Sequence, residues 1–270
     1  MKLLLFLNQD IHSLTALNFL FPALREHQVK IVLSQKIGSL VNLESGVVMM
    51  KEIERNGWKD FFKNFDDKDR ASKKIFTFER VADFFGTKVL SYENVNSEMA
   101  IADFKGFAPD LIISIRFGQI FKQELINIPH LGVLNLHSGL LPKYRGVMAS
   151  FWAILNGEKK LNTTLHYISD SKIDAGDIID FSEEKIDWNS SLFLNINNLY
   201  KGGCDLIVKA LRKISDGEEI AVFKQKDFGD GGYFSYPNKV DLDRFLQLMP
   251  LFEKDDARIA FDKVLEVVTS

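Results

Sequence analysis

The sequence has almost no cysteine, no long apolar run and no excess of charge of one sign. Its single cysteine, Cys204, cannot form an internal disulfide and has no Cys or His cluster beside it of the kind that zinc requires. The apolar run Met1–Leu7 is cut short by polar residues, so it is shorter than a signal-peptide core or a membrane span. A net charge of -3 gives no general field that attracts polyanions. We therefore expect a cytoplasmic enzyme with no metal, membrane or nucleic-acid partner.

A glycine-rich turn is also missing after the first strand-like run, where Asn8, Gln9 and Asp10 stand instead. A dinucleotide fold needs glycines at this place so that the backbone can approach the pyrophosphate. The pattern therefore disfavours an NAD-dependent dehydrogenase.

Short apolar runs and helix-spaced apolar residues alternate along the chain. The runs predict strands at Lys2–Leu7, Lys30–Ser34, Lys88–Ser91, Asp110–Ile115, Gly132–His137, Thr163–Ser169 and Ile178–Phe181. The spacing predicts helices at Leu14–Leu24 (kinked or ended at Pro22), Gln119–Ile126, Ser191–Ile214 (weakened by Gly202 and Gly203) and Val240–Phe252. This alternation predicts an α/β fold, with a mostly parallel twisted sheet wrapped by helices on both faces. We expect a core domain at residues 1–215 and a small α+β segment at 216–270 that packs on it.

Aromatic residues are spaced among lysines and aspartates in the region after Gly38. A nucleic-acid platform would combine aromatic and basic side chains, but the interleaved acids argue against one here. We interpret the aromatics as core-facing residues of amphipathic helices. They are Trp58, Phe61, Phe62, Phe65, Phe76, Phe78, Phe84 and Phe85.

Asn135 and His137 lie at the carboxyl end of a predicted strand, where open parallel sheets place their ligands. Residues two apart on a strand point to the same face, so the amide and the imidazole project side by side. An amide donor can stabilise an oxyanion, and an imidazole can move protons near neutral pH, so the pair suits acyl transfer. On spacing alone, His137 is better explained as a hydrogen-bonded structural residue.

The polar loop from Ser138 to Gly146 follows directly and is bounded by glycines. Gly139 and Gly146 allow unusual backbone angles and Pro142 fixes one, so the loop is suited to form the wall of a ligand pocket.

The strand end and the loop together read Leu134-Asn135-Leu136-His137-Ser138-Gly139-Leu140-Leu141-Pro142-Lys143-Tyr144-Arg145-Gly146. This run resembles the signature of formyltransferases that use 10-formyltetrahydrofolate. Upstream, Pro109–Ser114 and Gly118–Ile120 agree with that family, as do Thr164–Tyr167 and Ile173–Asp177 downstream. The resemblance is strong over about residues 108–181. It departs at Ser138-Gly139, where the family often has proline or alanine and then serine. The resemblance implies a Rossmann-like core.

The resemblance implies roles for several groups of residues. The family's catalytic asparagine, histidine and aspartate correspond to Asn135, His137 and Asp174. Without the resemblance, Asp174 is better explained as a turn residue. The donor 10-formyltetrahydrofolate is expected to bind at Arg116, Phe117, Gly118, Gln119, Ile120, Ile173, Ala175, Gly176 and Asp177. Acceptor contacts are expected from Ser138, Gly139, Tyr144, Arg145 and Tyr233. His166 is interpreted as a packed or pocket-lining residue.

The acceptor is not identified by this motif. Methionyl-tRNA formyltransferases add a basic C-terminal barrel, whereas residues 216–270 contain 12 acidic and 7 basic residues, a balance that disfavours tRNA. The expected acceptor is therefore a small amine, foremost an amino-deoxysugar nucleotide. The alternatives are a hydroxyornithine side chain, methionyl-tRNA, and a binding module of the same fold without turnover.

Overall fold

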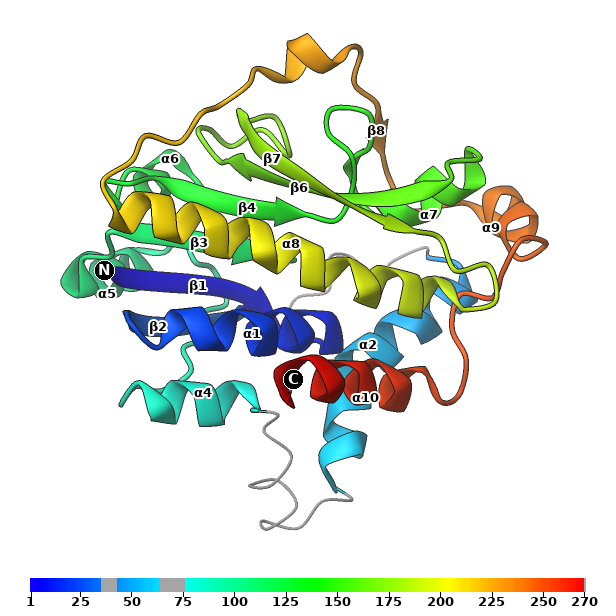
Figure 1. The fold of residues 1–270 in the computed structure, drawn as a ribbon, viewed down its shortest axis with the longest axis horizontal. Coiled ribbons are helices and arrows are strands. Elements are labelled where there is room, and N and C mark those ends of the chain that lie inside the picture. Colours follow the sequence, from blue (N-terminus) through cyan, green and yellow to red (C-terminus); the bar gives the residue numbers. More distant parts are fainter. Residues whose placement is uncertain (35–42, 64–75, 270) are drawn as a thin grey trace.

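Six strands form the main sheet, in the order β2-β1-β3-β4-β6-β7 (Figure 1). They are β1 (Lys2–Asn8), β2 (Gln28–Ser34), β3 (Leu111–Ile115), β4 (Val133–His137), β6 (Lys160–Tyr167) and β7 (Ile178–Lys185). The computed structural model describes residues 1–34, 43–63 and 76–269. The strands β1 to β4 pair in parallel, and β6 and β7 are antiparallel. The predicted α/β class with a mostly parallel sheet is confirmed.

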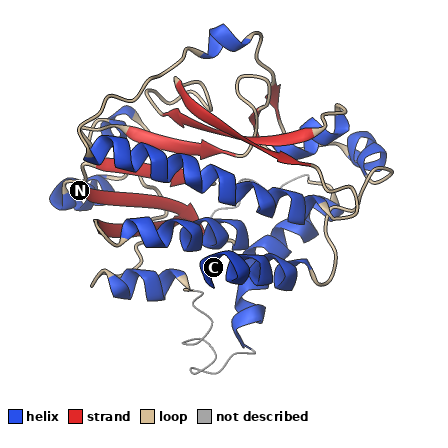
Figure 2. Ribbon diagram, in the orientation of Figure 1, coloured by secondary structure: helices blue, strands red, loops and turns tan. Residues whose placement is uncertain are grey.

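Helices cover both faces of the sheet (Figure 2). They are α1 (Ile11–Leu24), α2 (Ser45–Lys63), α4 (Phe78–Phe84), α5 (Glu98–Phe107), α6 (Gln123–Ile126), α7 (Ala149–Leu155) and α8 (Leu192–Ser215). Successive side chains of β1 point to opposite faces. Leu3, Leu5 and Leu7 therefore join the core beneath α1 and α8, whereas Leu4 and Phe6 join the core beneath α5 and α6. This two-sided burial explains why β1 is an uninterrupted apolar run.

Several of the predicted elements differ from the observed ones. Helix α1 runs through Pro22 to Leu24, because the buried side chains around Pro22 hold the last turn against the sheet. The stretch Lys88–Ser91 is not a strand, since only Leu90 forms a bridge, to Val32. The predicted helix Gln119–Ile126 is reduced to α6, because the Gln119 amide bonds the backbone of Tyr92 and Val95 and holds that part as a loop.

The C-terminal segment contacts the core at several places. It contains η1 (Gln225–Phe228), β8 (Tyr233–Phe234), α9 (Lys239–Phe245) and α10 (Asp256–Thr269). Strand β8 pairs with the short strand β5 (Arg145–Gly146), α9 packs on α7, and α10 packs on α1, α2 and α8. The predicted helix Val240–Phe252 ends early, at Phe245, and the carbonyls of Pro250 and Leu251 accept from the first N–H groups of α8. The boundary at residue 215 stays a prediction.

The interpretation of the aromatics as core-facing holds for Phe76, Phe78 and Phe85 and is wrong for Phe84, whose side chain is 55% exposed. Phe65 and the side chains of Trp58, Phe61 and Phe62 lie outside the described residues. Among the helices that the structure describes, none is both long and apolar enough to cross a membrane.

Candidate active site

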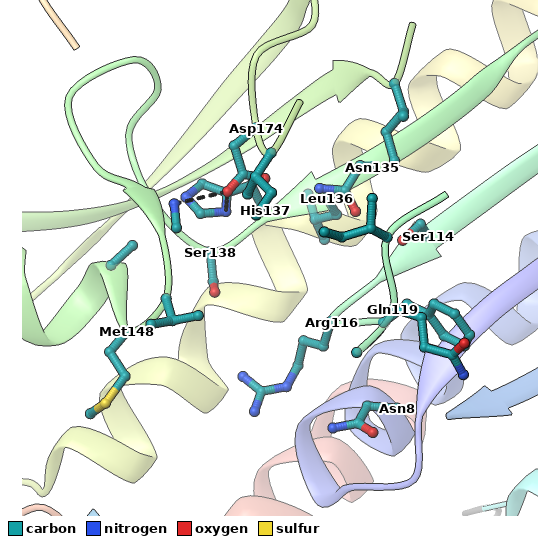
Figure 3. Close-up of a pocket in the computed structure, with 18 of the residues that line it drawn as sticks. Asn8, Ser114, Arg116, Gln119, Asn135, Leu136, His137, Ser138, Met148 and Asp174 are labelled. Atoms are coloured by element: carbon teal, nitrogen blue, oxygen red, sulfur yellow. Dashed lines mark hydrogen bonds and ion pairs between the residues drawn. The ribbon is translucent and has the colours of Figure 1, made fainter. Parts of the chain in front are cut away.

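A cavity of about 380 Å³ opens where β1, β3 and β4 end (Figure 3). Asn8 closes β1, Arg116 follows β3, and Asn135 and His137 belong to β4. All four side chains line the cavity, as the carboxyl-end rule for parallel sheets predicts. The loop that carries Asp174 forms the facing wall.

His137 has an acceptor at each ring nitrogen. Its Nε2 lies 2.7 Å from the carbonyl oxygen of Tyr144, and its Nδ1 lies 3.4 Å from Oδ2 of Asp174. A carbonyl oxygen can only accept a hydrogen bond, so Nε2 carries a proton, and Nδ1 faces the Asp174 carboxylate. The ring is therefore held in one orientation between Tyr144 and Asp174.

Asp174 is held in a conformation that few non-glycine residues adopt. Its φ is 50°, and the backbone N–H of Gly146 donates to its Oδ2 over 3.0 Å. Burial by itself raises the pKa of Asp174, but the His137 ring and the Gly146 N–H outweigh it and hold that pKa well below its usual range. The carboxylate is therefore ionised at neutral pH and faces His137.

Asn135 is oriented by His166, which is 1% exposed. The Nδ1 of His166 lies 2.9 Å from the carbonyl oxygen of Tyr167 and must carry a proton there. The Nε2 can then accept from the Asn135 amide nitrogen, 3.0 Å away. One N–H of that amide is used, which leaves its other N–H available for a ligand. The interpretation of His166 as a packed, pocket-lining residue agrees with this position.

Two glycines permit close approaches around the site. A Cβ on Gly139 would stand 2.7 Å from Nε2 of His137, and one on Gly176 would stand 1.7 Å from the carbonyl oxygen of Tyr167. Both distances are too short for a carbon atom. Gly139 is therefore needed because no side chain fits at its position. Gly146 has the positive φ (93°) that the sequence led us to expect.

Arg116 lies within a buried charge cluster. Its guanidinium donates to Asp10 and to Glu54, each over 2.9 Å, and its Nη1 lies 3.4 Å from the Tyr200 hydroxyl. Burial by itself raises the pKa of Glu54, but Arg116 and His12 outweigh it and hold that pKa well below its usual range. Arg116 and Glu54 line the cavity, and the cluster joins α1, α2, β3 and α8.

The structure brings most of the expected site residues together. Within the described residues, the following expected positions line the cavity: Asn135, His137, Asp174, Arg116, Phe117, Gly118, Gln119, Ile120, Ile173, Ser138 and Tyr233. The others are not among the lining residues of the described chain: Gly139, Tyr144, Arg145, Ala175, Gly176 and Asp177. Tyr144 is 1% exposed and donates its hydroxyl to Glu158, and the Arg145 side chain binds Gln225.

Several lining residues were not predicted from the sequence. Asn8 could have been found, because it ends the first strand of a parallel sheet. Glu54 and Lys51 carry no local signal, since only the tertiary packing of α2 brings them to the cavity. No group of three or more metal-ligating side chains occurs among the residues with described positions.

Comparison with protein families matches residues 51–196, more than half of the chain, to the family described as Formyl transferase. The methionyl-tRNA formyltransferase of Clostridium tetani (strain Massachusetts / E88) is 35% identical over 178 residues, which is 65% of this chain and 57% of that protein. That of Macrococcus caseolyticus (strain JCSC5402) is 34% identical over 154 residues, 56% of this chain and 49% of that protein. The chain thus spans about half the length of the curated relatives it matches.

Solved structures share the fold over a larger part of the chain. A sugar N-formyltransferase from Shewanella sp. FDAARGOS_354 is similar with a TM-score of 0.56 and 16% identity, covering 92% of this chain and 87% of that one. An N-formyltransferase from Helicobacter canadensis has a TM-score of 0.57 and 21% identity, covering 94% of this chain and 82% of that one. At these identities the likeness is one of fold. With the family match over residues 51–196, the chain belongs to the formyl transferase family.

Proposed function

We propose that this protein transfers a formyl group from 10-formyltetrahydrofolate to the amine of a small acceptor, an amino-deoxysugar nucleotide. The observation that carries the proposal is the arrangement of Asn135, His137 and Asp174 around one cavity (Figure 3). An amide donor, a ring with an acceptor at each nitrogen and an ionised carboxylate meet where parallel strands end. Together they provide the groups that amide-bond transfer requires.

Each of the three side chains has a separate part in the proposed reaction. The acceptor nitrogen attacks the formyl carbon, and the free N–H of Asn135 and the His137 imidazolium stabilise the oxyanion that forms. Asp174 holds His137 and assists removal of one proton from the attacking amine. The bond from the formyl carbon to N10 then breaks, and N10 takes up a proton as tetrahydrofolate leaves. No step in this sequence needs a metal.

The donor is assigned to the part of the cavity between residues 116–120 and the loop at residues 173–174. Phe117 and Ile120 offer apolar surface there, and backbone groups of the same segment can bond the pterin. Ala175, Gly176 and Asp177 would contribute by shaping this loop.

The acceptor is assigned to the part of the cavity between α2 and β8. Tyr233, 65% exposed, and Tyr236 both line this part and offer aromatic faces for a nucleotide base. The Nζ of Lys51 lies 5.0 Å from the Tyr236 ring centroid, where it can meet a phosphate. The Helicobacter canadensis structure, described as a complex with folinic acid and dTDP-3-aminofucose, supports this class of acceptor.

Methionyl-tRNA is the second candidate acceptor, because the curated relatives similar in sequence are methionyl-tRNA formyltransferases. The 12 acidic and 7 basic residues of segment 216–270 speak against it, since RNA binding relies on cations placed along the phosphate backbone.

The test is an acceptor screen with 10-formyltetrahydrofolate in which release of tetrahydrofolate is followed. The acceptors are amino-deoxysugar nucleotides, hydroxyornithine and aminoacylated initiator tRNA. We expect turnover with an amino-deoxysugar nucleotide. Turnover with charged tRNA alone would contradict the small-acceptor proposal, and turnover with none would contradict formyl transfer itself.

A further inference from the structure

We propose that Gln225, in the C-terminal segment, is a positioning residue for Asp174, and that Arg145 holds Gln225 in the orientation this requires. The inference rests on the proposed formyl transfer, in which Asp174 holds His137. It gives the C-terminal segment a part in the reaction that is separate from acceptor binding.

The side-chain amide of Gln225 uses all of its hydrogen-bonding capacity within the protein. Its Nε2 donates to the carbonyl oxygens of Asp174 and Gly176, each over 2.8 Å. Its Oε1 accepts from Nε and Nη2 of Arg145, over 3.0 Å and 2.7 Å. Gln225 is 6% exposed, so water does not compete for these bonds. The bonds therefore fix both the position and the orientation of the amide.

Arg145 decides which end of this amide faces the Asp174 loop. A guanidinium has only N–H groups, so it can accept no hydrogen bond from the Gln225 nitrogen. A flipped amide would place its two N–H groups against the guanidinium and its oxygen against two carbonyl oxygens. Arg145 thus selects the orientation in which Gln225 donates to the loop.

Asp174 needs such support because its backbone has a φ of 50°. A left-handed conformation at a residue with a Cβ costs about 1 kcal/mol or more and persists only where neighbouring groups hold it. Gln225 bonds the carbonyl of Asp174 itself and the carbonyl two residues further on. Gln225 therefore holds the strained turn through two of its carbonyl groups.

The same short strand, β5, holds Asp174 a second time. Gly146, the residue after Arg145, donates its backbone N–H to the Asp174 carboxylate over 3.0 Å. Strand β5 is itself paired with β8, and Phe223 exchanges two backbone hydrogen bonds with Ile178, just beyond the loop. These contacts form a closed ring, which we call the Gln225 bracket; its members are Arg145, Gln225, Asp174 and Gly146. It presents the carboxylate to His137.

A purely structural link between the C-terminal segment and the core is the competing explanation. Such a link would affect folding stability but would not act through the Asp174 carboxylate. The two explanations differ in whether the effect of changing Gln225 depends on Asp174 being present.

The experiment is a double-mutant cycle with Gln225→Glu and Asp174→Asn, measured by tetrahydrofolate release. The Gln225→Glu substitution would keep the length of the side chain and its contact with Arg145 but would lose both donations to the loop. We expect Gln225→Glu to lower kcat ~10- to 100-fold with the donor KM within ~2-fold, and to change kcat by less than ~2-fold in the Asp174→Asn background. Gln225→Met, which is uncharged and of similar length, should change kcat in the same way in both backgrounds. The matched control is Gln247→Glu, an exposed position of the same segment.

Hydrogen exchange of the Gly146 amide, followed by NMR, gives a readout that does not depend on turnover. Its N–H is bonded to Asp174, so we expect exchange to accelerate by ~10-fold or more in Gln225→Glu and Gln225→Met and to stay unchanged in Gln247→Glu. Equal losses of kcat in both backgrounds, or unchanged Gly146 exchange, would overturn the inference. If the wild-type protein transfers no formyl group, the proposed function fails, and the Gly146 exchange still decides whether the bracket exists.

Discussion

His137 is fixed by a carbonyl at one ring nitrogen and a carboxylate at the other, so its orientation does not depend on a bound ligand. We expect His137→Asn to lower kcat for formyl transfer by ~10² to 10⁴, because the proposed oxyanion loses the positive charge of the imidazolium beside it. Binding of the folate product, measured by fluorescence titration with tetrahydrofolate, should survive. The control is His130→Asn, since His130 is exposed and lies outside the cavity. Full activity of His137→Asn with any acceptor would contradict the mechanism and favour a different use of the cavity.

A substitution of Asn135 tests whether its amide also stabilises the proposed oxyanion. Asn135→Asp keeps the shape of the side chain but replaces its N–H groups by a carboxylate, which repels a developing oxyanion. We expect kcat to fall by ~10² to 10³. Asn127→Asp, at an exposed position, is the control and should retain wild-type kcat. A variant as active as that control would show that Asn135 only shapes the cavity.

The sequence could predict the central pair of residues and not the contacts that hold them. Asn135 and His137 follow from a two-residue period at a strand end, and Asp174 from the resemblance of its loop to a known family. His166 bonds Asn135, which is 31 residues away. Glu54 bonds Arg116, 62 residues away, and Gln225 bonds Asp174, 51 residues away. No local pattern encodes such pairs, since tertiary packing selects them.

Among the elements, α8 shows how packing can outweigh helix propensity. A Cβ on Gly203 would stand 2.8 Å from a methyl carbon of Leu136 and 3.0 Å from Oγ1 of Thr163, and both residues are buried. We therefore expect Gly203→Ala to destabilise the protein by ~1 to 3 kcal/mol in urea unfolding, despite the better helix propensity of alanine. The sequence suggested only that this glycine weakens its helix.

The matched control for this prediction is Gly106→Ala in α5, where a Cβ would meet nothing within 4 Å. That variant should gain ~0.5 to 1 kcal/mol, because alanine loses less conformational freedom on folding. A gain of stability in both variants would show that α8 can move away from β4 without cost.

The elements that the sequence predicted well are the buried strands, whose continuous apolar runs arise from burial on both faces. The elements that it predicted poorly lie where a side chain or a single bridge replaces regular pairing. Gln119 holds its loop by side-chain bonds, and Leu90 touches the sheet at one residue. Apolar periodicity reports burial, so it cannot distinguish such segments from regular helices and strands.

Over the whole molecule, the Arg116 cluster makes stability depend on pH. The folded-state pKa of Glu54 is depressed, so the unfolded chain binds its proton at a higher pH than the folded chain does. The stabilisation is therefore fully present above the unfolded pKa of about 4.3 and is lost as the pH falls toward the folded value. The free energy of unfolding should thus decrease between about pH 5 and pH 3. Urea unfolding along this range measures the slope.

Glu54→Gln separates this cluster from the other acidic groups of the protein. It removes up to one bound proton from the difference between the folded and unfolded states, so the slope between about pH 5 and pH 3 should become shallower. At neutral pH the variant should also be less stable, because Arg116 keeps only the Asp10 carboxylate. Glu52→Gln, exposed on the same helix, is the control and should keep the wild-type slope. If the two variants have equal slopes, Glu54 does not contribute to the acid sensitivity, and the cluster acts through packing alone.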